Sequence, residues 1–256
     1  MSRKALTAAA ILIGMGTAFA SPALAKSPAG VKNIVLVHGG FVDGSGWKGV
    51  YDILTKDGYE VLVVQNPTVT LDGDVEATRQ VIAKATKPVL LVGHSYGGAV
   101  ITEAGADPKV KSLAYIAALA PDVGESVFEL ATRPVPGESG PPLLPPADGF
   151  IIVDPVKFPT AFAQDVDISI TGFMAVAQVP WGVGAVQTKL TSAAWKDKPV
   201  RWMLTTQDHM VSPTTQRFMA TRAKAKLTVI NSSHAVMLSH PKDVADFIEA
   251  AAADAN

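Results

Sequence analysis

Short apolar runs alternate along the chain with longer stretches whose apolar residues recur at helical spacing. The short runs are rich in Val, Ile and Leu throughout, which is typical of strands that are buried on both faces of a sheet. Such strands are predicted at residues 33–39, 59–65, 88–93, 110–119, 199–206 and 226–231. Helices are predicted at residues 47–56, 72–86, directly after Ser95, 214–222 and 242–252. The alternation predicts an α/β fold in which a mostly parallel central sheet has helices on both faces.

The alternation is interrupted between residues 121 and 190. Residues 133–150 contain too many prolines for regular structure, yet the whole segment is too rich in aromatic residues for a plain linker. We therefore predict a lid inserted into the α/β domain, covering an apolar site; the alternative is a disordered insertion. The segment carries three basic and eight acidic residues, which disfavours a strongly anionic substrate. Its aromatic residues are Phe128, Phe150, Phe158, Phe162, Phe173 and Trp181.

The N-terminus has the layout of a secretory signal peptide. Two basic residues precede an apolar stretch at residues 8–20, and Ala23-Leu24-Ala25 offers a small-residue cleavage site. We predict a signal peptide at residues 1–25, an α/β domain at residues 26–256, and export to the periplasm or the medium. A retained membrane anchor is the alternative, but the apolar stretch is shorter than the roughly 20 residues that span a bilayer. After cleavage no stable membrane anchor is expected.

Charge and composition exclude several classes of function. Removal of Arg3 and Lys4 with the signal peptide changes the formal net charge from −1 to −3, so nucleic acid is not an expected partner. The chain has no Cys, which excludes disulfides, thiolate metal sites and a Cys nucleophile. Its five His residues show no metal-binding i, i+4 spacing around a Glu. We therefore predict neither a metal nor another cofactor.

The sequence VLLVGHSYGGAVITEA, residues 89–104, places Ser95 between a predicted strand and a predicted helix. The pattern G-x-S-x-G is weak alone, but this context is typical of a nucleophile elbow, a sharp turn that holds the serine in strained backbone dihedrals. Gly93 and Gly97 supply the small residues that such a turn requires. The alternative is a structural serine in a glycine-rich turn. We predict that Ser95 is the nucleophile.

A serine nucleophile requires a base and a group that orients the base. Asp208 follows the predicted strand at residues 199–206, and His234 follows the last predicted strand. Both therefore lie at the carboxyl ends of strands, where open α/β sheets bind their ligands. Asp122 also follows a predicted strand and stays an alternative to Asp208 as the acid. We predict a triad of Ser95, Asp208 and His234.

A hydrolase of this kind also needs two donors for a developing oxyanion. The Tyr96 amide follows the nucleophile at a helix N-terminus, and the turn VHGGF after the first strand brings the Gly40 amide to the same edge of the sheet. We predict these two backbone N–H groups as the oxyanion hole. Candidate residues of the substrate pocket are Gly39, Phe41, Phe128, Trp181 and Met237.

These motifs resemble those of the α/β-hydrolase family, in the branch of bacterial esterases, plant methylesterases such as the salicylate esterases, and plant hydroxynitrile lyases. The resemblance covers residues 32–253 and is carried by VLVHGGFVDGSGW, VGHSYGGAV, ALAPDVGES, TTQDHMVSP and SHAVMLSHP. It implies the α/β-hydrolase fold and the order Ser, Asp, His along the chain. Hydroxynitrile lyases are expected to have a Lys after the catalytic His and a Thr in the first-strand turn, where this chain has Ala235 and Gly39. Both departures favour ester hydrolysis over cyanohydrin cleavage.

The sequence therefore predicts a cofactor-independent serine hydrolase that cleaves a small, mostly neutral carboxylic ester through an acyl-enzyme. The expected partner is this small-molecule ester substrate. Two alternatives stay open. The same triad serves lyases, perhydrolases and acyltransferases, and the fold also occurs as a non-catalytic ligand-binding module.

Overall fold

The computed structural model describes residues 28–138 and 140–255, so the predicted signal peptide lies outside the described residues. The core is a sheet of six strands, all parallel, in the order β2-β1-β3-β4-β7-β8. The predicted α/β fold with a parallel central sheet is confirmed. The strands are β1 (Asn33–Val37), β2 (Glu60–Val64), β3 (Val89–His94), β4 (Val110–Ile116), β7 (Val200–Thr205) and β8 (Lys226–Ile230).

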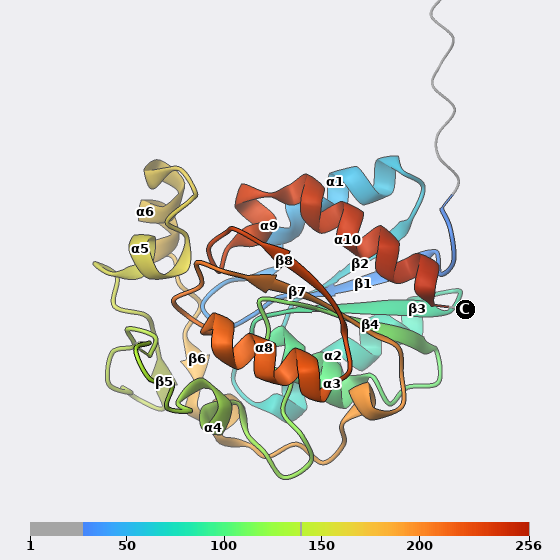
Figure 1. Ribbon diagram of the computed structural model, residues 1–256. Coiled ribbons are helices and arrows are strands. Elements are labelled where there is room, and N and C mark those ends of the chain that lie inside the picture. Colours follow the sequence, from blue (N-terminus) through green and yellow to red (C-terminus); the bar gives the residue numbers. More distant parts are fainter. Residues whose placement is uncertain (1–27, 139, 256) are drawn as a thin grey trace, which may run out of the picture.

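Helices cover both faces of this sheet (Figure 1). One layer consists of α1 (Lys48–Lys56), α9 (Val236–Ser239) and α10 (Pro241–Asp254), preceded by the 3-10 helix η1 (Gly44–Trp47). The other layer consists of α2 (Leu71–Lys84), α3 (Gly97–Ala104) and α8 (Pro213–Arg222), with the 3-10 helix η2 (Ala194–Lys196) beside α3. No helix of the described residues is long and apolar enough to cross a bilayer.

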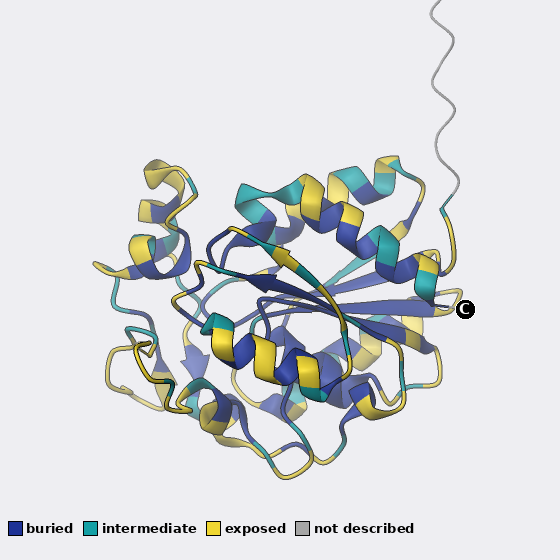
Figure 2. Cartoon of the chain, in the orientation of Figure 1, coloured by how far each residue is buried: buried dark blue, intermediate teal, exposed yellow. Residues whose placement is uncertain are grey.

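The uniformly apolar strands divide their side chains between two hydrophobic cores. Along β3, Leu90 and Val92 pack in the core beneath α1 and α10, whereas Leu91 packs with α3 on the opposite face. All six residues of β3 are buried (Figure 2). At the edges of the sheet, β2 and β8 are partly exposed because each pairs with a single strand. The two cores together fix the central strands whose ends carry the candidate site.

The strand predicted at residues 110–119 ends earlier, at Ile116. Ala117 has φ +46°, which is outside the range of an extended strand, and the chain leaves the ladder there. The next residues stay buried but bend around the turn at Ser95, and the Leu119 amide donates to the Ser95 carbonyl (3.0 Å). The apolar pattern outlasts the strand because these residues pack against the turn and not in the sheet.

Residues 121–190 form an insertion at the end of the sheet where the parallel strands terminate (Figure 1). Its described residues between Arg133 and Gly149 have neither helix nor named strand, in line with the proline content. The rest of the insertion has short elements that the sequence did not predict. These are α4 (Val127–Ala131), β5 (Phe150–Ile151), α5 (Phe158–Phe162), α6 (Ile168–Val176), β6 (Trp181–Gly182) and α7 (Val183–Gln187).

Candidate active site

Ser95 occupies a strained turn between β3 and α3. Its φ is +54°, a conformation that non-glycine residues rarely adopt and that is often found at functional sites. A Cβ on Gly93 would lie 2.6 Å from the Gly97 carbonyl oxygen, and one on Gly97 would lie 2.5 Å from the Val37 carbonyl oxygen. From Leu91 to Val100, every residue except Ser95 is buried. The turn therefore presents the Ser95 side chain alone to the space above the sheet.

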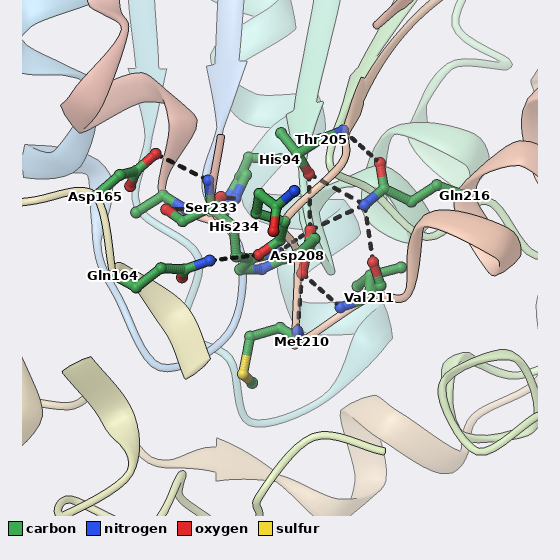
Figure 3. Close-up of polar contacts among 12 residues, drawn as sticks. His94, Gln164, Asp165, Thr205, Asp208, Met210, Val211, Gln216, Ser233 and His234 are labelled. Atoms are coloured by element: carbon green, nitrogen blue, oxygen red, sulfur yellow. Dashed lines mark hydrogen bonds and ion pairs between the residues drawn. The ribbon is translucent and has the colours of Figure 1, made fainter. Parts of the chain in front are cut away.

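Asp208 and His234 form a buried pair at the ends of β7 and β8 (Figure 3). The His234 Nδ1 lies 2.8 Å from the Asp208 Oδ2, and the other carboxylate oxygen accepts from the amides of Met210 and Val211, both at 2.8 Å. Because a carboxylate accepts hydrogen bonds, the His234 Nδ1 atom carries the proton of this contact. The Nε2 atom is then free to accept a proton from another group.

Gln216 on α8 holds the Asp208 carboxylate from the opposite side, and the sequence did not single it out. Its amide nitrogen donates to Asp208 Oδ2 (2.9 Å) and to the Val211 carbonyl (2.8 Å), while its oxygen accepts from the Thr205 amide (3.2 Å). The Thr205 hydroxyl also donates to Asp208 Oδ2 (3.0 Å). Gln216 is fully buried. The only signal for Gln216 in the sequence is a Gln in the first turns of the helix that follows Asp208. A Gln at such a position is too common to indicate a contact with the carboxylate.

His94, at the end of β3, contacts both the backbone and the ring of His234. Its Nε2 lies 2.9 Å from the His234 carbonyl oxygen, and the two rings are 4.6 Å apart. Complete burial, reinforced by the neighbouring His234, holds the pKa of His94 well below its usual value. His94 is therefore neutral, with its proton on Nε2, and it acts as a fixed donor to the backbone of the histidine loop.

The loop after β1 is held by His38. Burial lowers the pKa of His38, and the neutral ring bridges two segments: Nδ1 donates to the Gly39 carbonyl (2.8 Å) and Nε2 accepts from the Asn66 amide (2.9 Å). Phe41, two residues after Gly39 in the same loop, has φ +68°. A Cβ on Gly39 would lie 2.7 Å from the Ser95 Cβ, so this loop lies against the Ser95 turn. The backbone of Gly40 is thereby brought to the side of Ser95.

Tyr96, the other predicted oxyanion donor, is fixed through its side chain. Its hydroxyl donates to the buried Asp74 carboxylate on α2 (2.6 Å), which also accepts from the Thr68 amide (2.7 Å). Burial raises the pKa of Asp74, and the two donors counteract this effect only in part. Thr68 in turn accepts from the Gly182 amide of β6 (2.7 Å). Tyr96, directly after Ser95, is thus tied to both α2 and the insertion.

A cavity of about 170 Å³ opens beside Ser95. Three of the predicted pocket residues, Phe41, Phe128 and Trp181, line it, and the Phe41 and Trp181 rings meet edge to face at 5.3 Å. The cavity lining contains no charged side chain. Residues of the insertion form much of its wall. Of the six aromatic residues of the insertion, Phe128 and Trp181 line the cavity, whereas Phe150, Phe158, Phe162 and Phe173 do not. The remaining lining residues are Leu119, Ala131, Thr132, Pro141, Leu143, Leu144, Pro146, Ile151, Val186, Met210 and Val211.

Two of the predicted pocket residues, Gly39 and Met237, do not line this cavity, so their assignment to the pocket is corrected. The Gly39 backbone lies against the Ser95 turn, and Met237 is buried at the start of α9, in the core beneath α1 and α10. The reason is that the chain turns into α9 after His234 and directs Met237 to that helical layer. Asp122, the alternative acid, forms an ion pair with Lys196. Among the described residues there is no cluster of three His, Asp or Glu side chains that could hold a metal.

A parallel α/β sheet with a serine turn after β3 and a histidine–aspartate pair after β7 and β8 defines the class of α/β hydrolases. A model of the alpha/beta hydrolase family matches residues 34–247, and the chain belongs to this family. The resemblance predicted from the motifs is therefore confirmed, as is the prediction that the protein is an enzyme of this class.

The relatives include proteins named as hydrolases and esterases. The chain is 27% identical over 244 residues to the alpha/beta hydrolase nvfD of Aspergillus novofumigatus (strain IBT 16806), which covers 87% of this chain and 97% of that protein. It is 36% identical over 121 residues to the carbendazim hydrolyzing esterase of Nocardioides sp. (strain SG-4G). That match covers 41% of this chain and 50% of the relative, so the chain spans about half the length of that protein.

Similar solved structures share the fold along almost their whole length. A pyrethroid hydrolase from Sphingobium faniae JZ-2 superposes with a TM-score of 0.74 at 23% identity, covering 88% of this chain and 98% of that chain. A methylesterase from Arabidopsis superposes with a TM-score of 0.70 at 19% identity, covering 85% and 97%. At these identities the likeness establishes the fold.

Proposed function

We propose that the protein is a serine hydrolase that cleaves a small, mostly uncharged carboxylic ester through an acyl-enzyme. The observation that carries this proposal is the buried Asp208–His234 pair at the same edge of the sheet as the strained Ser95 turn. The names of the esterase and hydrolase relatives support the reaction class.

In the proposed reaction, the Ser95 hydroxyl attacks the ester carbonyl while His234 Nε2 takes its proton. His234 then gives this proton to the leaving alcohol, and the acyl group stays on Ser95. Water enters, loses a proton to Nε2 and attacks the acyl carbonyl, after which Ser95 regains its proton and the acid leaves. Asp208 keeps His234 in the tautomer that presents Nε2 and stabilises the imidazolium that forms in each half of the cycle.

The negative charge on the carbonyl oxygen is proposed to be stabilised by the amides of Gly40 and Tyr96. Neither amide donates to another group within the part of the chain that the structure describes. Both belong to segments that are fixed by buried polar contacts, through His38 in one case and Asp74 in the other. Preorganised donors of this kind each contribute about 2.7–4 kcal/mol of transition-state stabilisation.

The cavity supports the proposed class of substrate. Its wall is apolar apart from Ser95 and Thr132, so burial of a charged group there would be unfavourable. Its volume of about 170 Å³ compares with an apolar cavity of about 150 Å³ that binds benzene. We therefore propose that the ester carries one small apolar group, up to the size of a ring, which occupies this cavity.

The test is a comparison of the wild-type protein with Ser95→Ala. We expect fluorophosphonate to label the wild type at Ser95 and the protein to hydrolyse short p-nitrophenyl esters, while the variant loses labelling and about 10⁶-fold in turnover. Near-normal turnover in the variant would exclude Ser95 as the nucleophile. A rate that depends on added alcohol or peroxide would indicate an acyltransferase or a perhydrolase. A folded wild-type protein that is not labelled would favour the ligand-binding module.

A further inference from the structure

One segment of the insertion contacts the loop that carries His234. Asp165, between α5 and α6, accepts hydrogen bonds from the Ser232 hydroxyl (2.7 Å) and from the Ser233 amide (2.9 Å) through the same carboxylate oxygen. Ser232, Ser233 and His234 are themselves buried. The exposed Asp165 therefore holds the backbone directly before the histidine from the outside of the molecule.

Two residues just before Asp165 also contact the loops of His234 and Asp208. These residues are Phe162 and Gln164. The Ala235 amide, directly after the histidine, donates to the Phe162 carbonyl (3.0 Å). The Phe162 ring meets the His234 ring edge to face at 4.9 Å. The Gln164 side chain donates to the Gln207 carbonyl, directly before Asp208. In Figure 3, Gln164 and Asp165 lie on the insertion side of the site and reach toward these two loops.

The sheet alone gives little support to the loop that carries His234. β8, which leads into it, is the edge strand and is partly exposed, so it has a neighbour on one side only. From the sheet side, the loop is held by His94, which donates to the His234 carbonyl, and by the Gln207 amide, which donates to the Ser232 carbonyl (3.1 Å). The contacts from the insertion are therefore a large part of what fixes the position of His234.

We propose that Asp165 is a positioning residue for His234, so that the insertion helps to assemble the triad in addition to lining the substrate cavity. The role of His234 as the base rests on the proposed function. Asp165 acts through the backbone of Ser233 and the hydroxyl of Ser232. An error of about 1 Å in the position of a catalytic group can cost up to about 10²-fold in rate.

The proposed role predicts an effect on turnover and not on substrate binding. Asp165 does not line the cavity beside Ser95. In Asp165→Ala, we expect kcat to fall about tenfold or more, while KM stays within about twofold. A substrate-binding role would instead raise KM.

Asp165→Asn distinguishes a hydrogen bond from a charge effect. Burial alone would raise the pKa of Asp165, but the hydrogen bonds from Ser233, Ser232 and Ser239 outweigh it and hold the pKa below its usual value. The residue is thus ionised at neutral pH and accepts both bonds through one oxygen. An Asn keeps one acceptor oxygen at this place and lacks the charge. We expect Asp165→Asn to restore most of the kcat that Asp165→Ala loses.

Asp167 provides a matched control two residues further along the same segment. Its carboxylate also accepts from a serine amide and a serine hydroxyl, at 2.8 Å and 2.6 Å, but both belong to Ser169 at the start of α6. Asp167→Ala therefore removes the same kind of contact from the insertion without touching the histidine loop. We expect its kcat to stay within about twofold of wild type, because none of its bonds leads to the triad.

The experiment measures kcat and KM for wild type, Asp165→Ala, Asp165→Asn, Asp167→Ala and Ser95→Ala at a temperature where all are folded. A second readout is the low-field proton NMR signal of the His234 Nδ1–H, which we expect to broaden or shift in Asp165→Ala alone among the Asp variants. Unchanged kcat and an unchanged signal in Asp165→Ala would overturn the proposal, as would equal losses in the Ala and Asn variants or an equal loss in Asp167→Ala.

The two readouts also separate this proposal from the proposed function. Wild-type turnover that Ser95→Ala abolishes, together with an unaffected Asp165→Ala, would overturn the positioning role alone. If the wild type hydrolyses none of the esters, the proposed function fails, and the His234 signal still decides whether Asp165 fixes the ring.

Discussion

Two aspartates follow strands of the same sheet, Asp208 after β7 and Asp122 after β4, and their surroundings differ. Asp208 is buried, and its carboxylate is surrounded by His234 and by uncharged donors. Asp122 is half-buried and forms an ion pair with Lys196. The position of an acid after a strand therefore does not decide its role. The two aspartates differ in their partners, because Asp208 pairs with His234 whereas Asp122 is paired with Lys196.

The order of the strands explains the difference. β7 is the direct neighbour of β8, whose end leads into the His234 loop, so Asp208 and His234 leave the sheet side by side. β4 lies one strand further away, and the chain after it bends around the Ser95 turn before it reaches Asp122. There the carboxylate meets Lys196, at the end of η2. The same local pattern in sequence thus leads to two different partners.

The largest effect is expected for Asp208→Asn. We expect kcat to fall about 10⁴-fold, because an amide at this place favours the tautomer of His234 that lacks a free Nε2. Steady-state hydrolysis of a short ester, with circular dichroism to verify folding, measures the effect. A loss below about tenfold would show that another group orients His234.

A weaker perturbation is Gln216→Met, which keeps the volume of the side chain and removes its hydrogen bonds. We expect kcat to fall about tenfold, because Asp208 loses one of its donors and gains freedom to move. The free energy of unfolding should fall by about 1–3 kcal/mol, because the Thr205 amide and the Val211 carbonyl lose a buried partner. Kinetics and urea denaturation measure the two effects. A variant with normal turnover and reduced stability would limit Gln216 to a role in folding.

The smallest effect is expected for Asp122→Asn. Turnover should stay within about twofold of wild type, and the loss of a partly solvated ion pair should cost less than about 1 kcal/mol of stability. Burial alone would raise the pKa of Asp122, but Lys196, the Val123 amide and Arg222 together hold it below its usual value. The stabilisation is therefore present above the ordinary Asp pKa and disappears as pH falls through the lower folded pKa. Urea denaturation at pH 7 and at about pH 2.5 measures it. A large loss of turnover would make Asp122 the acid.

Much of the fold could be predicted because it depends on local patterns. Apolar runs marked the six strands, including the partly exposed edge strands β2 and β8, and the helices between them agree to within a few residues. The prediction was less accurate where an apolar residue has another reason to be buried, as at Leu119, which packs around the Ser95 turn. The short elements of the insertion were not predicted because few of them exceed five residues, too short for a helical or strand period to be visible.

The candidate site divides in the same way. Ser95, Asp208 and His234 follow strands, so their place at one edge of the sheet could be predicted from the parallel topology. Gln216 and Asp165 could not, because their contacts with the loops of Asp208 and His234 depend on how α8 and the insertion pack in three dimensions. Met237 was assigned wrongly because nearness to His234 in sequence does not determine on which face of the sheet a side chain is buried.

Gly39 limits how this protein could acquire a different reaction. Even a single carbon atom added to its backbone would lie 2.7 Å from the Ser95 Cβ and 3.2 Å from the Ser95 hydroxyl oxygen. A threonine at this place, as expected in the turn of the hydroxynitrile lyases, would collide with the Ser95 side chain unless the loop moved first. The loop is held by His38 and Asn66, so substitutions that loosen those contacts would have to come before the threonine. The order of substitutions, and not only their identity, would decide whether an evolutionary path from the proposed ester hydrolysis to that chemistry stays functional.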